Sequence, residues 1–303
     1  MGAFVDGPVR VSVPATSANL GPGFDCLGLA LDLRDELVGE VTGQPLDISV
    51  VGEGADEVPR STDHLVVRAM AEGFTALGVE APGLSLHCTN RVPHSRGLGS
   101  SAAAIVGGLV LARALVPDGA DRLDDDRLLA LANLLEGHPD NVAPALLGGL
   151  VVSGQEGDGD GGTRVWAQRV PVHESVRAVA FVPPTGVATE VARGLLPETV
   201  PYRDAVANTG RAALLVAALA RAPELLPIAT EDFVHQRYRE PAMPETLALV
   251  AQLRADGMAA VVSGAGPTVL ALVTAGDADL AARVPHGWTC HRLAVDTAGA
   301  RVD

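Results

Sequence analysis

Lysine is absent from this 303-residue chain, and all 22 of its basic residues are arginines. The absence excludes mechanisms that need a lysine side chain. These are a phosphate-binding loop ending in Gly-Lys-Ser/Thr, a lysine Schiff base, a Ser-x-x-Lys acylation site and the strand lysine with which protein kinases hold ATP. A codon bias explains the absence, since the chain is rich in alanine, glycine, arginine and valine, but the exclusions hold whatever the cause.

Aromatic residues, cysteines and long apolar runs are also scarce. Aromatic residues make up 3% of the chain and hydrophobic residues 48%, so the cores must be aliphatic. Cys26, Cys88 and Cys290 are odd in number and far apart, which argues against disulfides or zinc and favours the cytoplasm. Apolar stretches such as residues 212–220 are far shorter than the about 20 residues that cross a bilayer. We therefore expect no membrane partner, and residues 1–10 show no signal peptide.

Positive charge is scarce relative to negative charge, and the net charge is −15. A nucleic-acid surface needs clustered basic residues, so we expect no nucleic-acid partner. The charge does not exclude a phosphorylated small molecule, because backbone N–H groups bind phosphate locally.

The hydrophobic pattern predicts strands and helices that interleave without regular βαβ spacing, so the fold class is α+β. The predicted strands are residues 9–13 (ended by Pro14), 47–51, 84–88, 146–152 (a strand pair), 177–182 and 259–262. A turn-rich stretch is expected at residues 15–28. The predicted helices are one starting at residues 61–63, then 100–115, 124–135 (ended by Gly137), 204–221 and 245–255 (followed by Gly257).

Residues 155–163 (QEGDGDGGT) combine glycines with acids. An EF-hand needs glycine at its sixth position and a later bidentate glutamate, and neither is present. We interpret the stretch as a hairpin loop and place a domain boundary there. The expected domains are residues 1–160 and 161–303.

One glycine-rich block carries the clearest chemistry. Two glycines, two hydroxyls and a helix start bring free N–H donors together at the positive end of the helix dipole, which suits a di- or triphosphate. A dinucleotide fingerprint fails, because residues 90–96 separate the block from its strand. The alternative that this block is only a glycine turn capping a core helix remains open. The candidate phosphate-binding residues are Pro93, Ser95, Arg96, Gly97, Leu98, Gly99, Ser100, Ser101, Ala102 and Ala103.

Three further blocks hold polar groups on turns. Asn19 and Asp25 lie in a glycine-rich loop, where they suit a small polar ligand or an ordinary Asx turn equally well. Residues 136–141 (EGHPDN) place four polar groups on a turn with Pro139, which indicates a site. Residues 263–268 (SGAGPT) form a glycine turn after an apolar run and are either a site or simply a turn.

Together these blocks resemble the GHMP family of small-molecule kinases. That family has an N-terminal strand-and-loop block, a central Pro-x-x-x-Gly-Leu-Gly-Ser-Ser-Ala block and a C-terminal Gly-x-Gly-Pro block. Here they correspond, in that order, to residues 11–28, 93–103 and 262–269. Residues 15–29, 136–144, 189–193 and 238–244 resemble the family members that phosphorylate L-homoserine to O-phospho-L-homoserine on the route to threonine.

The resemblance implies a two-domain GHMP kinase fold. An N-terminal, ribosomal-protein-like α+β domain would bind ATP, and a ferredoxin-like α+β domain would follow. It also implies a homodimer.

The resemblance further implies where the substrates lie. ATP would lie on residues 93–103, with Mg²⁺ at Ser100. Homoserine would lie between the halves, held by Asp140 at its ammonium, with Asn19, Asp25 and His138 nearby. Arg193 and Arg239 would hold its carboxylate and Thr189 would lie near the acceptor oxygen. Phosphoryl transfer needs no strong base, and Asp25 and His138 are the local candidates.

One position departs from the resemblance. Homoserine-phosphorylating members usually carry a second acid, which looks like a Mg²⁺ ligand, where this chain has Leu134. Either Leu134 extends the apolar face of Leu128 and Leu131, with Glu136 serving the metal instead, or phosphoryl transfer is weakened or lost. The alternatives are therefore another GHMP kinase for a different amino-acid or sugar-like alcohol, and a ligand-binding homologue with weakened catalysis.

Overall fold

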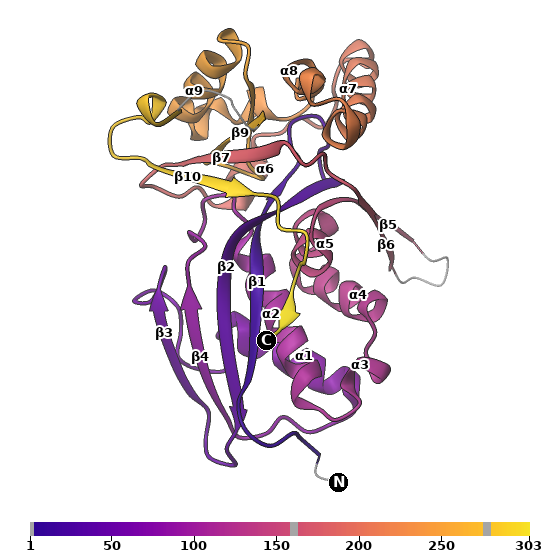
Figure 1. The fold of residues 1–303 in the computed structure, drawn as a ribbon, viewed down its shortest axis with the longest axis vertical. Coiled ribbons are helices and arrows are strands. Elements are labelled where there is room, and N and C mark those ends of the chain that lie inside the picture. Colours follow the sequence, from indigo (N-terminus) through magenta and orange to yellow (C-terminus); the bar gives the residue numbers. More distant parts are fainter. Residues whose placement is uncertain (1–2, 158–162, 275–279) are drawn as a thin grey trace.

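The computed structural model describes residues 3–157, 163–274 and 280–303. Within them, seven strands form one sheet in the lower part of Figure 1. Its main path runs β11-β1-β2-β4-β3, and β5 joins β2 and carries β6 at its other edge. The strands are β1 (Val9–Ala18), β2 (Leu27–Val41), β3 (Asp47–Gly52), β4 (Leu84–Asn90), β5 (Leu150–Gly157), β6 (Thr163–Val170) and β11 (Arg301–Val302).

Helices cover one face of this sheet, and a second sheet lies above it (Figure 1). The first set comprises α1 (Leu65–Leu77), α2 (Ser100–Leu115), α3 (Gly119–Arg122), α4 (Asp125–Glu136) and α5 (Pro139–Leu147). The second sheet, in the order β10-β7-β9-β8, comprises β7 (Val176–Val182), β8 (Ala259–Val262), β9 (Val269–Thr274) and β10 (Thr289–Ala294). With it lie α6 (Thr189–Gly194), α7 (Tyr202–Arg221), α8 (Leu226–Ala229), α9 (Pro244–Ala255) and 3₁₀ turns at Pro223–Leu225, Gln236–Ala242 and Leu280–Arg283. The α+β class is confirmed.

Helices with clear end signals agree with the sequence. α2 has the predicted bounds. In α4, the Asp124 carboxylate caps the helix by accepting a hydrogen bond from the Arg127 N–H, and Gly137 ends it in the left-handed conformation. Gly257 follows α9 with a φ of +83°. The start of α1 shifts by a few residues, to Leu65.

Three predictions around the first strands and α5 are wrong. Pro14 does not end β1, because a register shift after it lets the strand continue to Ala18. β2 occupies a stretch for which no strand was predicted, although Leu27, Leu29 and Leu31 alternate along it. Residues 139–147 form α5, not the expected turn and strand, because proline fits the first position of a helix.

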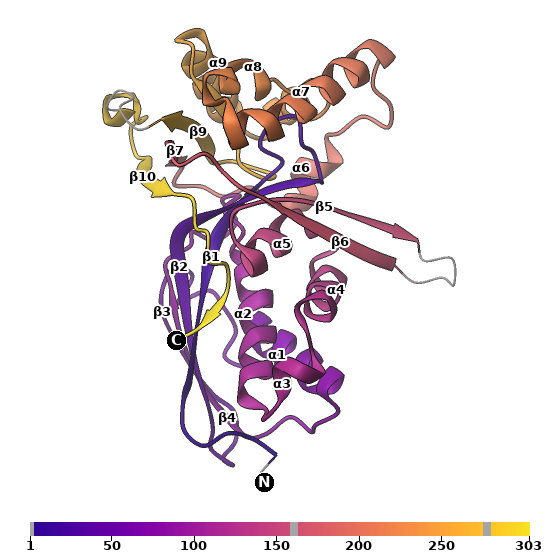
Figure 2. The same cartoon turned by 45° about the vertical axis from the view of Figure 1, so that its right-hand side comes forward.

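The hairpin β5–β6 projects from the body of the molecule (Figure 2). Of the loop predicted at residues 155–163, residues 155–157 belong to β5 and residue 163 to β6, and residues 158–162 lie outside the described residues. β6 pairs with β5 in the first sheet, although it follows the expected boundary at residue 160. The two-domain division at that residue stays a prediction.

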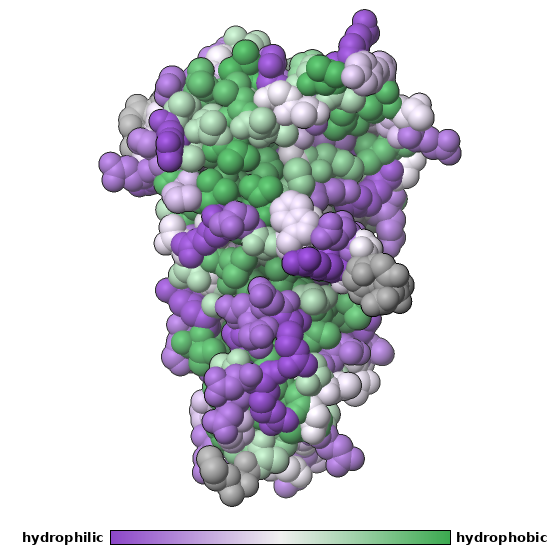
Figure 3. All heavy atoms as spheres, turned by 90° about the vertical axis from the view of Figure 1, so that its right-hand side faces the viewer, coloured by the Kyte–Doolittle hydropathy of each residue, from purple (hydrophilic) through white to green (hydrophobic). Residues whose placement is uncertain are grey.

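The core is aliphatic, as the shortage of aromatic residues predicts. One cluster fills the space between the first sheet and α1, α2 and α4, and another lies around β8, β9 and α9. A third joins Leu29 and Leu98 of the first half to Leu215 and Leu270 of the second. Apolar residues gather mainly over the upper part of the face drawn in Figure 3 and hydrophilic ones below. A search of the described residues finds no helix that could span a membrane.

Candidate active site

A pocket of about 460 Å³ lies where the four sequence blocks meet. The turn before α2 forms one wall, the start of α5 another, and α6 with the turn after β8 closes it. Its lining includes the predicted residues Asn19, Ser95, Gly97, Gly99, Ser100, Ser101, Glu136, His138, Asp140, Thr189, Arg193 and Arg239. It also includes Asn141, Glu190, Gly264 and Ala265, which the sequence analysis did not single out as ligand residues. Segments up to 246 residues apart in the sequence thus form one site.

The phosphate-binding turn owes its shape to two glycines. Gly97 and Gly99 have φ values of +77° and +70°, and Gly99 is the N-cap of α2. A side chain at Gly97 would collide with the carbonyl oxygen of Ser263, and one at Gly99 with the hydroxyl of Thr16. The N–H groups of the first turn of α2 have no acceptor within the helix. They therefore remain available to an anion in the pocket.

Hydrogen bonds fasten this turn to the first and last blocks. The Ser263 hydroxyl is 2.8 Å from that of Ser17 and 2.6 Å from the Gly97 carbonyl oxygen. The Thr16 N–H donates to the Leu98 carbonyl oxygen at 3.0 Å. The turn is therefore held from two sides before any ligand binds.

Five of the predicted phosphate-binding residues have other surroundings. Pro93, Leu98, Ala102 and Ala103 are buried. The Arg96 guanidinium donates to the carbonyl oxygens of His94 at 2.7 Å and Pro184 at 2.5 Å. Arg96 therefore ties the glycine turn to the segment before α6, and the pocket wall is formed by its neighbours Ser95, Gly97 and Gly99.

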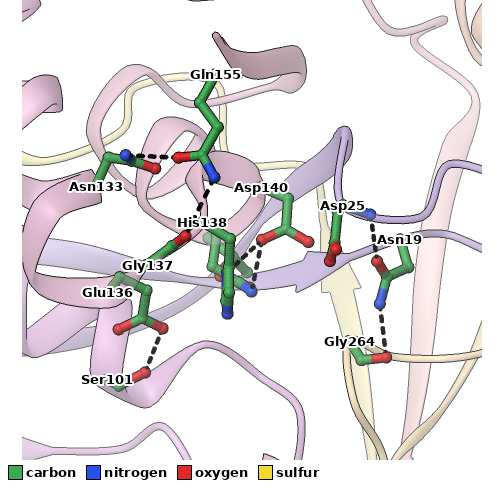
Figure 4. Close-up of polar contacts among 12 residues, drawn as sticks. Asn19, Asp25, Ser101, Asn133, Glu136, Gly137, His138, Asp140, Gln155 and Gly264 are labelled. Atoms are coloured by element: carbon green, nitrogen blue, oxygen red, sulfur yellow. Dashed lines mark hydrogen bonds and ion pairs between the residues drawn. The ribbon is translucent and has the colours of Figure 1, made fainter. Parts of the chain in front are cut away.

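Asp140 is the acid at the base of the pocket. It is 1% exposed and lies in the first turn of α5, where the helix dipole favours negative charge. Its Oδ1 is 2.8 Å from Nδ1 of His138, and Figure 4 shows the two side chains together. The hydrogen bond to Asp140 raises the pKa of His138, against the effect of burial. The Asp140 carboxylate thus favours the protonated form of His138.

Glu136 lies at the other end of the same turn. Its Oε1 accepts a hydrogen bond from the Ser101 hydroxyl at 2.7 Å (Figure 4). Burial raises the pKa of Glu136, with the hydrogen bond from Ser101 acting against it. A cation beside this carboxylate would relieve the cost of burying its charge. The described residues contain no cluster of three acid, histidine or cysteine side chains that could hold a metal without phosphate oxygens.

Strand β5 steadies the turn that carries Glu136 and His138. The Gln155 side chain accepts a hydrogen bond from the Asn133 amide at 3.0 Å and donates one to the Gly137 carbonyl oxygen at 3.5 Å (Figure 4). Neither Gln155 nor Asn133 was predicted to matter. They join two elements far apart in the sequence, so no local pattern could have identified them.

Asp25 and Arg193 form a bidentate ion pair at the edge of the pocket. The guanidinium nitrogens of Arg193 lie 2.7 and 3.1 Å from the two Asp25 carboxylate oxygens. Asn19 accepts a hydrogen bond from the Asp25 N–H at 2.9 Å and donates one to the Gly264 carbonyl oxygen at 2.8 Å (Figure 4). Arg193 lines the pocket, while Asp25 faces a neighbouring hollow of about 430 Å³.

Arg239 contrasts with Arg193 because no carboxylate in the described part of the chain contacts it. It is 1% exposed, and its Nη1 donates to the Gly264 carbonyl oxygen at 2.9 Å. Its Nε is buried without a hydrogen-bond partner among the described residues. Burial, and next the charge of Arg193, lower the pKa of Arg239 to about 10. A buried cation with an unused donor in a pocket wall suits an anionic ligand.

Leu134 lies away from this pocket. Its side chain is 77% exposed and lines a separate hollow with Leu131, whereas Leu128 is buried. Residues two apart on a helix point to nearly opposite sides, and Glu136 is the one that faces Ser101. An acid at position 134 would therefore not face the glycine turn in this conformation.

Comparisons with known proteins match two parts of the chain to one family. The family model for the GHMP kinases N terminal domain matches residues 64–149, and that for GHMP kinases C terminal matches residues 211–285. Homoserine kinase of Streptomyces avermitilis is 55% identical over 301 residues, covering 99% of this chain and 97% of its own. Homoserine kinase of Clavibacter michiganensis is 50% identical, covering 97% and 93%.

Solved structures share the fold. A crystal structure of homoserine kinase from Cytophaga hutchinsonii superposes with a TM-score of 0.81 at 26% identity, covering 98% of this chain and 97% of its own. Mevalonate diphosphate decarboxylase from Staphylococcus aureus has a TM-score of 0.68 at 14% identity, covering 98% of both chains, and is similar in fold alone.

Proposed function

The chain belongs to the GHMP kinase family, and we propose that it transfers the γ-phosphoryl group of ATP to the side-chain hydroxyl of L-homoserine, giving O-phospho-L-homoserine in threonine biosynthesis. Its homoserine kinase relatives cover nearly the full length of the chain. The observation that supports this acceptor best is that one pocket holds a buried acid and a buried arginine that has no carboxylate partner among the described residues.

Kinases of this family use ATP. Its phosphates would lie on the N–H groups and hydroxyls of Gly97, Gly99, Ser100 and Ser101, which need no lysine. A second hollow of about 240 Å³ adjoins the glycine turn and shares Ser95, Ser100 and Ser101 with the main pocket. It also has apolar walls, including Leu65 and Val66, so we assign the nucleoside of ATP to it.

The donor set at the turn before α2 fits Mg²⁺. One carboxylate and serine hydroxyls are hard oxygen ligands, and Mg²⁺ commonly uses one or two carboxylates together with phosphate oxygens and water. Glu136 and Ser100 would hold the ion, which would neutralise charge on the transferring phosphoryl group. A cation held by Glu136 would offset the burial that raises the pKa of this carboxyl.

Homoserine would lie with its charged ends on opposite walls of the pocket. Asp140 would bind its ammonium, with His138 and Asn19 beside it. Arg239 and Arg193 would bind its carboxylate, because guanidinium groups match carboxylate geometry. Thr189, which begins α6 on the pocket rim, would lie near the reacting hydroxyl.

The step itself is an in-line displacement. The homoserine hydroxyl oxygen forms a bond to the γ-phosphorus, the bond to the bridging oxygen of ADP breaks, and the hydroxyl proton passes to a phosphate oxygen or to water. The chain's residues contribute chiefly by positioning both substrates and stabilising charge. Because Nδ1 of His138 lies 2.8 Å from the Asp140 carboxylate, we assign His138 to holding Asp140 and the acceptor.

The function is tested by measuring ADP release with ATP, Mg²⁺ and a panel of L-homoserine, L-serine, L-threonine and sugar-like alcohols. We expect a clear preference for homoserine and a product with the mass of phosphohomoserine. Turnover of another alcohol with none of homoserine would identify a different GHMP kinase. Binding of ATP and homoserine by calorimetry without turnover at saturating Mg²⁺ would identify a silent homologue. A homodimer and a cytoplasmic location stay predictions.

A further inference from the structure

Two arginines with one proposed task must lie close together despite their like charge. Arg193 and Arg239 both line the pocket, and the charge of Arg193 acts on Arg239. Asp25 neutralises Arg193, but no carboxylate of the described residues contacts Arg239. Arg193 is partly exposed and Arg239 is buried, and the charges of Asp232, Asp25 and Asp140 favour the Arg239 cation. A group in contact with both guanidinium groups would also hold them side by side.

The ring of Phe24 is such a group. The Arg193 Cζ atom lies 5.6 Å from the ring centroid, and the Arg239 Cζ atom lies 5.7 Å from it. Both distances are within the about 6 Å over which an aromatic ring attracts a cation. One ring therefore contacts both guanidinium groups, and they come from elements 46 residues apart in the sequence.

The ring is itself held in place from the second half of the chain. His235 stacks on Phe24 with 4.9 Å between ring centroids and 30° between planes. His235 is 0% exposed, its pKa is lowered chiefly by burial, and its Nε2 lies 2.7 Å from the Gly21 carbonyl oxygen. The Asn208 amide donates to the Pro22 carbonyl oxygen at 2.8 Å. The loop that carries Phe24 is thereby anchored at Gly21 and at Pro22.

We propose that Phe24 is a positioning residue for the acceptor's carboxylate. The ring of Phe24 holds the guanidinium groups of Arg193 and Arg239 so that both can bind the same carboxylate. The proposal rests on the proposed function, because it concerns the acceptor site of that kinase. It makes Phe24 a determinant of acceptor choice. Alcohols that carry a carboxylate depend on the ring, and otherwise identical alcohols without one do not.

The test uses the full chain with two acceptors, L-homoserine and L-homoserine amide, in which a neutral amide replaces the carboxylate. Phe24→Leu removes the aromatic face and keeps an apolar side chain. We expect the KM for homoserine to rise about tenfold, while the KM values for the amide and for ATP change less than about twofold. Phe24→Tyr keeps the ring and should keep the KM for homoserine near that of the unaltered protein.

Phe233→Leu is the matched control. The Arg211 Cζ atom lies 5.9 Å from the centroid of the Phe233 ring, and neither residue lines the pocket. This variant loses the same kind of contact outside the site and should leave every KM unchanged. If Phe24→Leu does not fold, as judged by thermal unfolding, Phe24→Met takes its place.

Equal losses with homoserine and with the amide, a matching rise in the KM for ATP, or no change would each overturn the role of Phe24. If the unaltered protein turns over neither acceptor, the proposed function fails separately. Calorimetry with homoserine and the amide then decides about Phe24. Selective weakening of homoserine binding by Phe24→Leu supports its role, and equal or absent effects reject it.

Discussion

The two sides of the pocket use different chemistry for charged ligands. The phosphate side consists of backbone N–H groups, serine hydroxyls and glycines, without a lysine. The acceptor side consists of side-chain charges: Asp140, Arg193 and Arg239. The proposed phosphate side depends on backbone positions where only glycine fits. The proposed acceptor side depends on the packing of segments that are distant in the sequence. Such a division keeps the charged side chains for the amino-acid acceptor.

The two sides also differ in what holds them. Backbone hydrogen bonds, such as that from the Thr16 N–H to the Leu98 carbonyl oxygen, hold the glycine turn in place. The acceptor side depends on ion pairs and ring contacts between α6, the loop at residues 19–26 and the turn at Gln236–Ala242. We therefore expect changes on the two sides to affect different measured quantities.

The largest effect is expected from Asp140→Asn. This change keeps the shape of a buried side chain but removes the charge proposed to hold the ammonium. We expect kcat/KM for homoserine to fall about a thousandfold, as for the loss of one partner of a buried charge pair. The KM for ATP should stay near that of the unaltered protein. Steady-state kinetics with each substrate varied in turn checks this, and an equal change in both KM values would break the comparison.

Gly97→Ala tests the phosphate side. The residue has a φ of +77°, and a methyl group there would meet the Ser263 carbonyl oxygen. We expect the free energy of unfolding to fall by about 2–4 kcal/mol, from backbone strain together with the collision. The KM for ATP should rise more than that for homoserine. Urea denaturation and steady-state kinetics measure the two effects.

Gly257→Ala is its control. Gly257 has a φ of +83°, but an added Cβ would meet nothing within 4 Å. The free energy of unfolding of this variant should fall by only about 1–2 kcal/mol, which is the cost of an alanine in the left-handed conformation, and the activity should be unchanged. If both variants lose the same stability, the tight fit of the glycine turn against Ser263 is not what shapes it.

A smaller, pH-dependent effect is expected at His138. Its hydrogen bond to Asp140 raises its pKa in the folded chain above the ordinary value of 6.5. The stabilisation is therefore fully present below that value and is lost as the pH rises through the folded pKa. The difference in free energy of unfolding between the unaltered protein and His138→Asn should be larger at about pH 5.5 than at about pH 8.5. A difference that grows with pH would show that the pair does not favour the protonated ring.

The smallest effect is expected from Leu134→Glu. The side chain is exposed and lines a different hollow from the pocket. We expect kcat and the Mg²⁺ dependence of the rate to change less than about twofold, as for an exposed substitution away from the site. A large rise in rate at limiting Mg²⁺ would show that this position reaches the metal and that the chain lacks an acid it needs.

Local signals account for the parts of the fold that the sequence predicted. Helix α4 agrees because Asp124 and Gly137 act through neighbouring backbone groups, within one turn of the helix. The strand β2 was missed although its leucines alternate, and β1 was ended too early at Pro14. A β-bulge is decided by the partner strand, so proline by itself does not mark a strand end.

The sequence by itself determined which groups could bind a phosphate at the proposed site. Without lysine, the glycine turn and its serines are what remain, and two glycines with positive φ are a local requirement. Only the tertiary structure decided which charges are paired. Asp25 pairs with Arg193 across 168 residues, whereas Arg239 lines the pocket without a carboxylate partner among residues 3–157, 163–274 and 280–303. Such pairing depends on long-range packing, because the energy of a buried charge is set by neighbours that no local spacing encodes.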